Sequence, residues 1–148
     1  MLRIAKANIS PRTRFSSNSE IATVNFYANR IYYFQCTLDD LEAPRPIEVQ
    51  EALEVLMTIS QRIVFSGQSE LFEWLEWPLF IAGIEIDDLI QREWILQHLS
   101  RLDFKDALQS IFETQGTAKR RAGVGHLRSM FRHSCCEQKN YFCQWNAL

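Results

Sequence analysis

The stretch that decides the fold reads Trp77-Pro78-Leu79-Phe80-Ile81-Ala82-Gly83-Ile84-Glu85, and after a short gap the chain continues with Arg92-Glu93-Trp94-Ile95-Leu96. Tryptophans, a proline inside an apolar run and a glycine close to a glutamate are costly choices for an ordinary exposed helix. The stretch carries no nucleophile and no set of metal ligands. It therefore indicates a specific packing unit with a structural role, and not a catalytic or metal-binding site.

The length and composition of the chain indicate one globular domain. A chain of 148 residues can bury about two-thirds of the surface that its unfolded form exposes, which is enough for a real core. Hydrophobic residues make up 47% and charged residues 23%, and the formal net charge is −2, so the overall balance favours neither nucleic acid nor a membrane surface. Basic residues gather at the two ends, since residues 1–19 and 119–132 contain no acid.

The N-terminus and the apolar runs predict a protein without a secretory signal or a membrane span. No apolar segment of about 7–15 residues opens the chain, and the longest apolar run, Trp77 to Ile84, is less than half of the roughly 18 residues that a span needs. We therefore expect a soluble protein with reduced cysteines. Residues 1–18 are basic and contain serine, as mitochondrial transit peptides do, but Pro11 interrupts their only helical stretch, so a disordered N-terminus is expected instead.

Apolar residues spaced by three and four positions predict helices almost everywhere and hardly any strand. A first helix is expected to run from an N-cap at Ser19 to about Asp39. A second begins with Pro46 as its first residue and ends before Ser66. The residues expected on the buried faces are Val24, Tyr27, Ile31, Phe34 and Leu38 in the first helix and Val49, Leu53, Leu56 and Ile63 in the second.

The deciding stretch predicts a third helix in the middle of a bundle, from Ser69 to about Ile84, because its second half is apolar on all sides. Pro78 is expected to kink this helix by removing the hydrogen bond to the carbonyl of Trp74. Gly83 either lets another backbone approach closely or ends the helix with a positive φ. The narrow polar edge of the first half consists of Glu70, Glu73 and Glu76.

The Arg92 segment predicts a fourth helix that is tied to the third. Asp88 is its expected N-cap, in capping-box spacing with Gln91. Arg92 falls on the apolar stripe, so its guanidinium needs a partner, and both Asp88 and Glu85 are within plausible reach. A buried ion pair of this kind would fix the angle between the two helices. The stripe is expected to consist of Leu89, Ile95, Leu96, Leu99 and Leu102.

Two shorter segments complete an all-α fold, expected to be an irregular antiparallel bundle of about five to six helices. A fifth helix is expected from Phe104 to about Phe112, with Asp103 as its cap and Gln115-Gly116-Thr117 as its end, and residues 119–132 could form a sixth. The predicted organisation is a basic N-terminus over 1–18, a helical domain over 19–115 and a basic, cysteine-containing tail over 116–148. The residues expected to form the structural motif are Trp77, Pro78, Gly83, Glu85, Asp88, Arg92 and Trp94.

These residues, together with two earlier segments, resemble a known family. Trp77 to Glu85, followed by Arg92-Glu93-Trp94-Ile95-Leu96-Gln97-His98-Leu99, resembles the signature near the C-terminal end of the fungal-specific transcription factor domain, the regulatory domain of zinc binuclear cluster activators. The segments Tyr27 to Leu38 and Pro46 to Ile63 are similar to helices that precede it in that family. The resemblance covers roughly residues 19–131 and implies an all-helical regulatory domain.

The resemblance also limits what the chain is expected to do. In the family an N-terminal cluster of six cysteines holds zinc and reads DNA, whereas the first 134 residues here contain only Cys36. The chain is therefore expected to correspond to part of the family domain, about its C-terminal third. Neither a cofactor nor direct binding of nucleic acid is expected, and zinc belongs only to the missing cluster. The implied partners are proteins of the transcription machinery or a second copy, and the implied location is the nucleus, with the cytoplasm as the alternative.

Two groups of residues near the C-terminus suggest other sites. The first group has the residue types that bind zinc, but no paired C-x-x-C occurs and adjacent cysteines rarely hold one ion together. It consists of His126, His133, Cys135, Cys136 and Cys143. The second group is a candidate nuclear-import patch or simply a solvated basic face. It consists of Lys119, Arg120 and Arg121, with Arg128 and Arg132 nearby.

An enzyme is not predicted. Asp87 and Asp88 with Glu93 are spaced somewhat like the metal-diphosphate acids of helical isoprenoid synthases, but Gln91 stands where an acid is needed, and helix capping explains both aspartates. The first hypothesis is therefore a regulatory domain that acts in transcription through contacts with other proteins. The alternatives are an inert or interfering truncated remnant, and a sensor whose aromatic residues enclose a small apolar ligand.

Overall fold

The computed structural model describes residues 11–37 and 44–118, and the side chains of residues 18–37 and 44–116. These residues form five α-helices and one 3-10 helix, and the described ranges contain no strand. The expected all-α fold is confirmed. The elements are α1 (Pro11–Thr37), α2 (Ile47–Phe65), the 3-10 helix η1 (Ser69–Leu75), α3 (Glu76–Glu85), α4 (Leu89–His98) and α5 (Leu102–Ala118).

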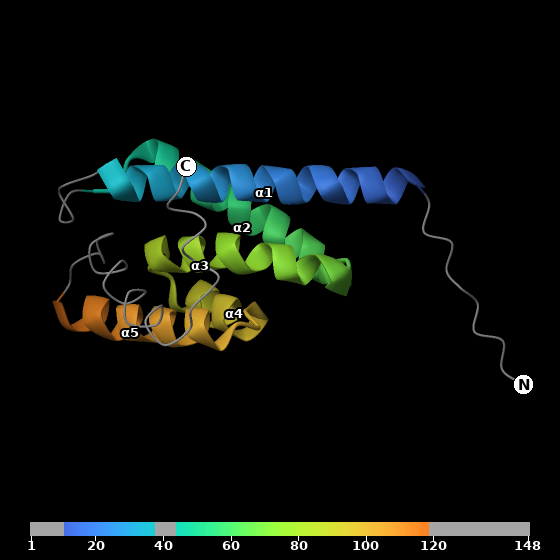
Figure 1. The fold of residues 1–148 in the computed structure, drawn as a ribbon. Coiled ribbons are helices and arrows are strands. Elements are labelled where there is room, and N and C mark those ends of the chain that lie inside the picture. The colour runs from blue at the N-terminus through green and yellow to red at the C-terminus, as the bar shows by residue number, and fades with distance from the viewer. Residues whose placement is uncertain (1–10, 38–43, 119–148) are drawn as a thin grey trace, which may run out of the picture.

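The helices lie in three levels with α3 in the middle. Figure 1 shows α1 and α2 side by side along one edge, α3 below them, and α4 and α5 on the far side of α3. Successive helices run in opposite directions, as expected for an antiparallel bundle. α3 packs against each of the other elements, whereas α1 and α2 contact mainly each other, η1 and α3. No helix among the described residues is long and apolar enough to span a membrane.

The core follows the predicted apolar spacing on α1 and α2. Val24 and Ile31 of α1 and Leu56 and Ile63 of α2 are fully buried, as expected for one face of each helix. α3 is buried on all sides and not on one face only, because every side chain in it is buried except Trp77, which is half-buried. The prediction of a central helix, apolar on all sides, is thus confirmed for the second half of the deciding stretch.

The predicted starts of α1 and α2 were wrong. α1 begins at Pro11, so Ser19 lies inside the helix, where its carbonyl accepts a hydrogen bond from the hydroxyl of Thr23 at 2.7 Å. A proline fits the first turn of a helix, and this start signal was missed because Ser19 has the better capping side chain. Pro46 is the N-cap of α2 and not its first residue, and its carbonyl accepts from the amide of Val49 at 3.1 Å.

The predicted third helix is divided into two. Residues Ser69–Leu75 form η1, and the α-helix starts only at Glu76, so Pro78 lies in the first turn of α3. The cause expected for a kink is therefore missing, because an amide in the first turn has no partner within the helix to lose. Gly83 allows a close approach, as expected, but from a side chain: a β-carbon at this position would lie 2.8 Å from Cδ1 of Leu108. Its φ is not positive.

Two further predictions about α4 and α5 were wrong. Leu89 and Leu102 are 75% and 73% exposed, so the buried stripe is limited to the middle and end of α4, where Ile95 and Leu99 are buried. α5 does not end before Gly116 but continues to Ala118, and Asp103 lies within its first turn instead of capping it. The sixth helix expected over 119–132 lies outside the described residues.

Candidate functional site

The C-terminal end of α3 carries a buried carboxylate, Glu85, which is only 4% exposed. Its Oε1 accepts a hydrogen bond from Nε2 of Gln35 at 2.9 Å, and its Oε2 accepts from Nε of Arg45 at 2.8 Å. These donors come from α1 and from the segment just before α2, 50 and 40 positions away in the chain. Both oxygens are therefore engaged, as a buried carboxylate requires.

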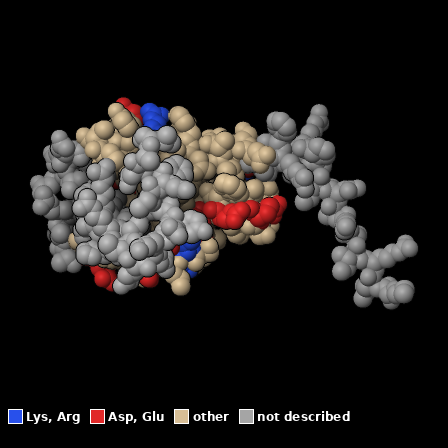
Figure 2. All heavy atoms as spheres, in the orientation of Figure 1, with Lys and Arg blue, Asp and Glu red and all other residues tan. Residues whose placement is uncertain are grey.

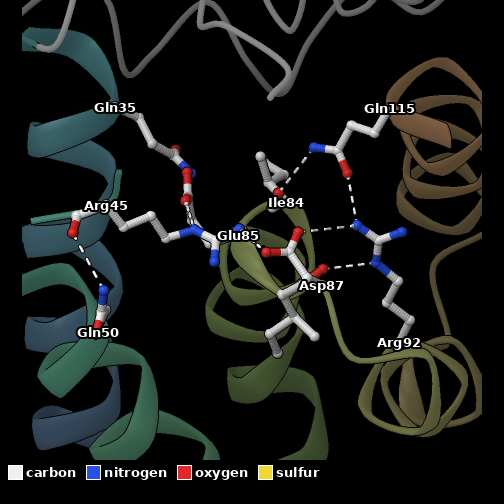
Figure 3. A network of polar contacts seen from close by, with 9 residues as sticks. Gln35, Arg45, Gln50, Ile84, Glu85, Asp87, Arg92 and Gln115 are labelled. Atoms are coloured by element: carbon white, nitrogen blue, oxygen red, sulfur yellow. Dashed lines mark hydrogen bonds and ion pairs between the residues drawn. The ribbon is translucent and has the colours of Figure 1, made fainter. Parts of the chain in front are cut away.

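The ion pair continues from Glu85 into the turn between α3 and α4, as Figure 3 shows. The second arm of the Arg45 guanidinium lies 2.8 Å from Oδ2 of Asp87, and Oδ1 of Asp87 lies 3.7 Å from the guanidinium of Arg92. The side chain of Asp87 is 73% exposed, so it contributes less than Glu85 does. Two arginines and two carboxylates thus form one connected network at this end of α3.

Arg92 extends this network to α5. Its Nε donates to the carbonyl of Ile86 at 2.6 Å, its NH2 group donates to Oε1 of Gln115 at 2.7 Å, and its guanidinium lies 4.3 Å from the ring centre of Phe112. Gln115 in turn donates to the carbonyl of Ile84 at 3.2 Å. Burial lowers the pKa of Arg92, and nearby Arg45 adds to this, while Asp87 opposes it. An arginine stays charged despite such a shift.

The predicted partners of Arg92 were wrong. Asp88 does not pair with Arg92 in the described contacts but caps α4, accepting the amide of Gln91 at 2.8 Å, which confirms the N-cap prediction. Glu85 is directed to Arg45 instead. The last carbonyls of a helix lack partners within it and carry partial negative charge, and here Arg92 donates to the carbonyl of Ile86 while Gln115 donates to the carbonyl of Ile84. The network is thus the C-terminal cap of the central helix.

The N-terminal end of α3 carries a second buried carboxylate, which the sequence interpretation placed on an exposed polar edge. Glu76 is 7% exposed. Its Oε1 accepts from the amide of Ser100 at 2.8 Å and from the Ser100 hydroxyl, and its Oε2 accepts from the amide of Arg101 at 3.4 Å. These donors precede the first residue of α5, so Glu76 lies at the positive end of that helix. Nothing in the nearby sequence distinguishes the buried Glu76 from Glu70 and Glu73, which lie on the same predicted edge.

The two motif tryptophans do not form one packing unit. Trp77 contacts α1, with its ring 5.6 Å from that of Tyr32 in an edge-on arrangement, and lies 6.2 Å from the ring of Phe80. Trp94 stacks on His98 of its own helix, with 4.3 Å between ring centres. The joints from α3 to α4 and α5 therefore include the polar network around Arg92, the Glu76 contacts, the stacked rings of Phe80 and Phe104 and the close contact between Gly83 and Leu108.

The arrangement is suited to holding helices together and offers no evident chemistry. Among the described residues, no group of three or more His, Cys, Asp and Glu side chains could hold a metal ion. Asp87 and Asp88, considered above as metal-binding acids, pair with Arg45 and cap α4. The proposed zinc group of His126, His133, Cys135, Cys136 and Cys143 lies outside the described residues. So does the basic patch of Lys119, Arg120 and Arg121.

Comparisons with known proteins place the chain in one family. Neither curated proteins nor solved structures gave a match. The family model for the fungal specific transcription factor domain matches residues 3–117, a segment that includes almost all of the described helices, as a partial segment of that domain. The family is regulatory and non-enzymatic, and its role relates to transcription. Because the match covers well over half of the sequence, the chain belongs to the fungal-specific transcription factor domain family.

Proposed function

We propose that this protein regulates transcription as a non-enzymatic helical domain in the nucleus, acting through contacts with other proteins. The observation that carries the proposal is the family match over residues 3–117, which includes all the contacts at both ends of α3. These contacts hold the helices in one arrangement, so the surface that they offer to a protein partner has a fixed shape.

The charge of the described helices argues against direct binding to DNA. Residues 11–37 and 44–118 together contain 14 acidic and 8 basic residues. Of the basic residues, Arg45 and Arg92 are occupied by the network at the end of α3. Figure 2 shows acidic side chains gathered over the end of the molecule where η1 lies. Because phosphate contacts supply most of the affinity for DNA, such a surface favours protein partners.

A tethering experiment tests the proposal. The full chain is fused to a heterologous DNA-binding domain, and the output of a reporter with the matching site is measured. We expect a several-fold change in either direction. The same fusion with Glu85→Ala, which breaks the network, is expected to lose the effect, while Asp87→Ala at the exposed side of the network keeps it. Unchanged output with the fusion present at normal level would count against a regulatory role.

Nuclear location is tested separately. A fusion too large for passive diffusion through nuclear pores is expected to accumulate in the nucleus. Replacing Lys119, Arg120 and Arg121 by alanine is expected to leave it in the cytoplasm if these residues form the import patch. A fusion that stays in the cytoplasm without any substitution contradicts the proposed location, whereas nuclear accumulation that survives the triple substitution contradicts only the patch.

A further inference from the structure

The first turn of α4 exposes two large apolar side chains. Leu89 is 75% exposed and Ile90 is 80% exposed, although Leu89 falls on the predicted buried stripe. Among the described residues, no other two exposed large apolar side chains are adjacent in sequence. Single exposed apolar residues are common on protein surfaces, whereas a contiguous apolar group indicates a contact site.

Acidic side chains surround this apolar pair. Asp87 and Asp88 precede it, and Glu93 follows on the same side of the helix, three and four positions later. All three acids are exposed, whereas Arg92, the only lysine or arginine between residues 86 and 100, is turned toward α5 with its side chain 13% exposed. An apolar centre with an acidic rim fits an apolar segment that carries basic residues. What we call the α4 patch consists of Asp87, Asp88, Leu89, Ile90 and Glu93.

The described part of the chain ends beside the α4 patch. Arg92 lies one turn after Leu89 and donates to Oε1 of Gln115 at 2.7 Å, and Figure 3 shows the two side chains directed at each other from neighbouring helices. Lys119 is four residues beyond Gln115, which is at most about 14 Å along an extended chain. The residues that follow α5 therefore begin within reach of the α4 patch.

The sequence after α5 has the chemistry that fits the α4 patch. Residues 119–132 contain five lysine and arginine residues and no acid. Val124, Leu127 and Phe131 are spaced by three and four positions, as on one face of a helix. Three arginines at steps of seven and four follow one edge of that face. These arginines are Arg121, Arg128 and Arg132.

The length of this segment also fits. Because α5 continues past Gln115 to Ala118, the chain has to reverse its direction to return to α4, and Gly123 and Gly125 permit such a turn. Residues 126–132 would then span about 10 Å as a helix, and residues 87–93 span about 9 Å at the same rise per residue.

We propose that residues 119–132 dock on the α4 patch of their own molecule, with the apolar face on Leu89 and Ile90 and the arginines beside the acids. The short connection to α5 holds the segment at a high effective concentration, which favours it over a separate protein or a second copy. The inference goes beyond the proposed function, because the family match ends at residue 117 and the segment lies outside it.

The first test measures how well the segment is protected from trypsin, which cleaves after lysine and arginine. The full chain is digested, and cleavage between residues 119 and 132 is followed by mass spectrometry beside a synthetic peptide of residues 117–134. We expect cleavage in the full chain to be slower by about tenfold or more, because only the undocked form is cut.

Variants of the α4 patch test whether it provides this protection. Leu89→Ser combined with Ile90→Ser removes the apolar centre and is expected to bring the cleavage rate close to that of the peptide. Both residues are exposed in the described fold, so the helical circular dichroism should stay unchanged. Phe65→Ser is the matched control, since Phe65 is an exposed apolar residue on α2, and it should keep the protection.

The charged part of the contact is tested with Glu93→Gln. One exposed ion pair contributes modestly, so we expect cleavage to be faster by about threefold. The difference from the unsubstituted chain should disappear at about 1 M salt, where charges are screened within about 3 Å. Glu51→Gln, at an exposed acid of α2, is the matched control and should leave the rate unchanged.

Digestion at about 1 and about 100 μM protein distinguishes docking within one molecule from docking on a second copy. Within one molecule the protection is the same at both concentrations. Protection that rises with concentration would overturn the proposal in favour of a second copy.

Three further results would overturn the proposal. One is cleavage of the full chain at the rate of the peptide, and another is protection that Phe65→Ser removes as well as the double serine variant does. The third is an unchanged rate in Glu93→Gln at low salt, which would contradict the pairing of the arginines with the acids. A protected segment in a chain without any reporter effect would leave this inference standing and contradict only the proposed function.

Discussion

The two ends of α3 each bury a carboxylate, and the two are held in different ways. Glu76 at the start of the helix accepts from the amides of Ser100 and Arg101. Glu85 at its end accepts from the side chains of Gln35 and Arg45. One end is therefore attached to α5 through backbone amides, and the other to α1 and the start of α2 through long side chains.

This difference shows that a buried acid can be stabilised without a basic partner. The start of α5 offers free amides and a partial positive charge, which are part of any helix. Glu85 stands instead at the negative end of its own helix, so it needs a full positive charge nearby. The comparison predicts that the C-terminal end is more sensitive to substitution, because removal of Glu85 leaves a charged arginine in a poorly solvated position.

Glu85→Ala is expected to have the largest effect, a loss of about 3–5 kcal/mol in the free energy of unfolding, since it breaks a buried ion pair. Urea denaturation measures the change. Asp87→Ala is the matched control at the exposed side of the same guanidinium and should cost less than about 1 kcal/mol. Equal losses of stability in the two variants would mean that Glu85 and Asp87 stabilise Arg45 to the same extent.

Arg92→Ala is expected to cost about 2–4 kcal/mol, because the carbonyl of Ile86 and the amide oxygen of Gln115 lose their charged donor. Arg92→Lys keeps the charge but lacks the forked geometry, so it should recover only part of the loss. The same urea titration distinguishes the two. A loss below about 0.5 kcal/mol in Arg92→Ala would show that the contacts of Arg92 contribute little to holding α5 against α3.

Trp77→Ala tests the packing at the N-terminal end of α3. Since Trp77 is only half-buried against Tyr32 and Phe80, we expect a loss of about 2 kcal/mol, less than for a fully buried tryptophan. Trp74→Ala is the control, because Trp74 is 58% exposed, and it should change the thermal midpoint little. A larger loss for Trp74→Ala than for Trp77→Ala would contradict the description of Trp77 as packed and Trp74 as exposed.

Glu76→Ala is expected to have the smallest effect of the four, about 1–2 kcal/mol, which is typical of a lost helix cap. Ser100 is exposed, so water can replace the carboxylate at its amide. Glu73→Ala provides an exposed control three residues earlier. A larger loss in the free energy of unfolding for Glu76→Ala than for Glu85→Ala would contradict this argument. It would mean that the carboxylate bound by helix-end amides contributes more to stability than the one paired with an arginine.

The parts of the fold that could be predicted from the sequence depend on short-range patterns. The Asp88 cap uses a contact over three residues, and the burial of α3 follows from its apolar composition on every side. The partners of Glu85 could not be predicted, because they depend on how a segment 40 residues away folds back. The extension of α5 was missed since a glycine inside a helix costs only about 1 kcal/mol, and Gln115 offsets this by its bonds to Arg92 and Ile84.

The central position of α3 has a consequence for the slowest motions of the protein. Every other described element packs on this helix, and its side chains are withdrawn from water. If α1 and α2, or α4 and α5, open locally, the amide hydrogens of α3 stay protected from one side. They are therefore expected to exchange with deuterium only when the whole fold opens, so the exchange rates between Phe80 and Ile84 report the global stability of the domain.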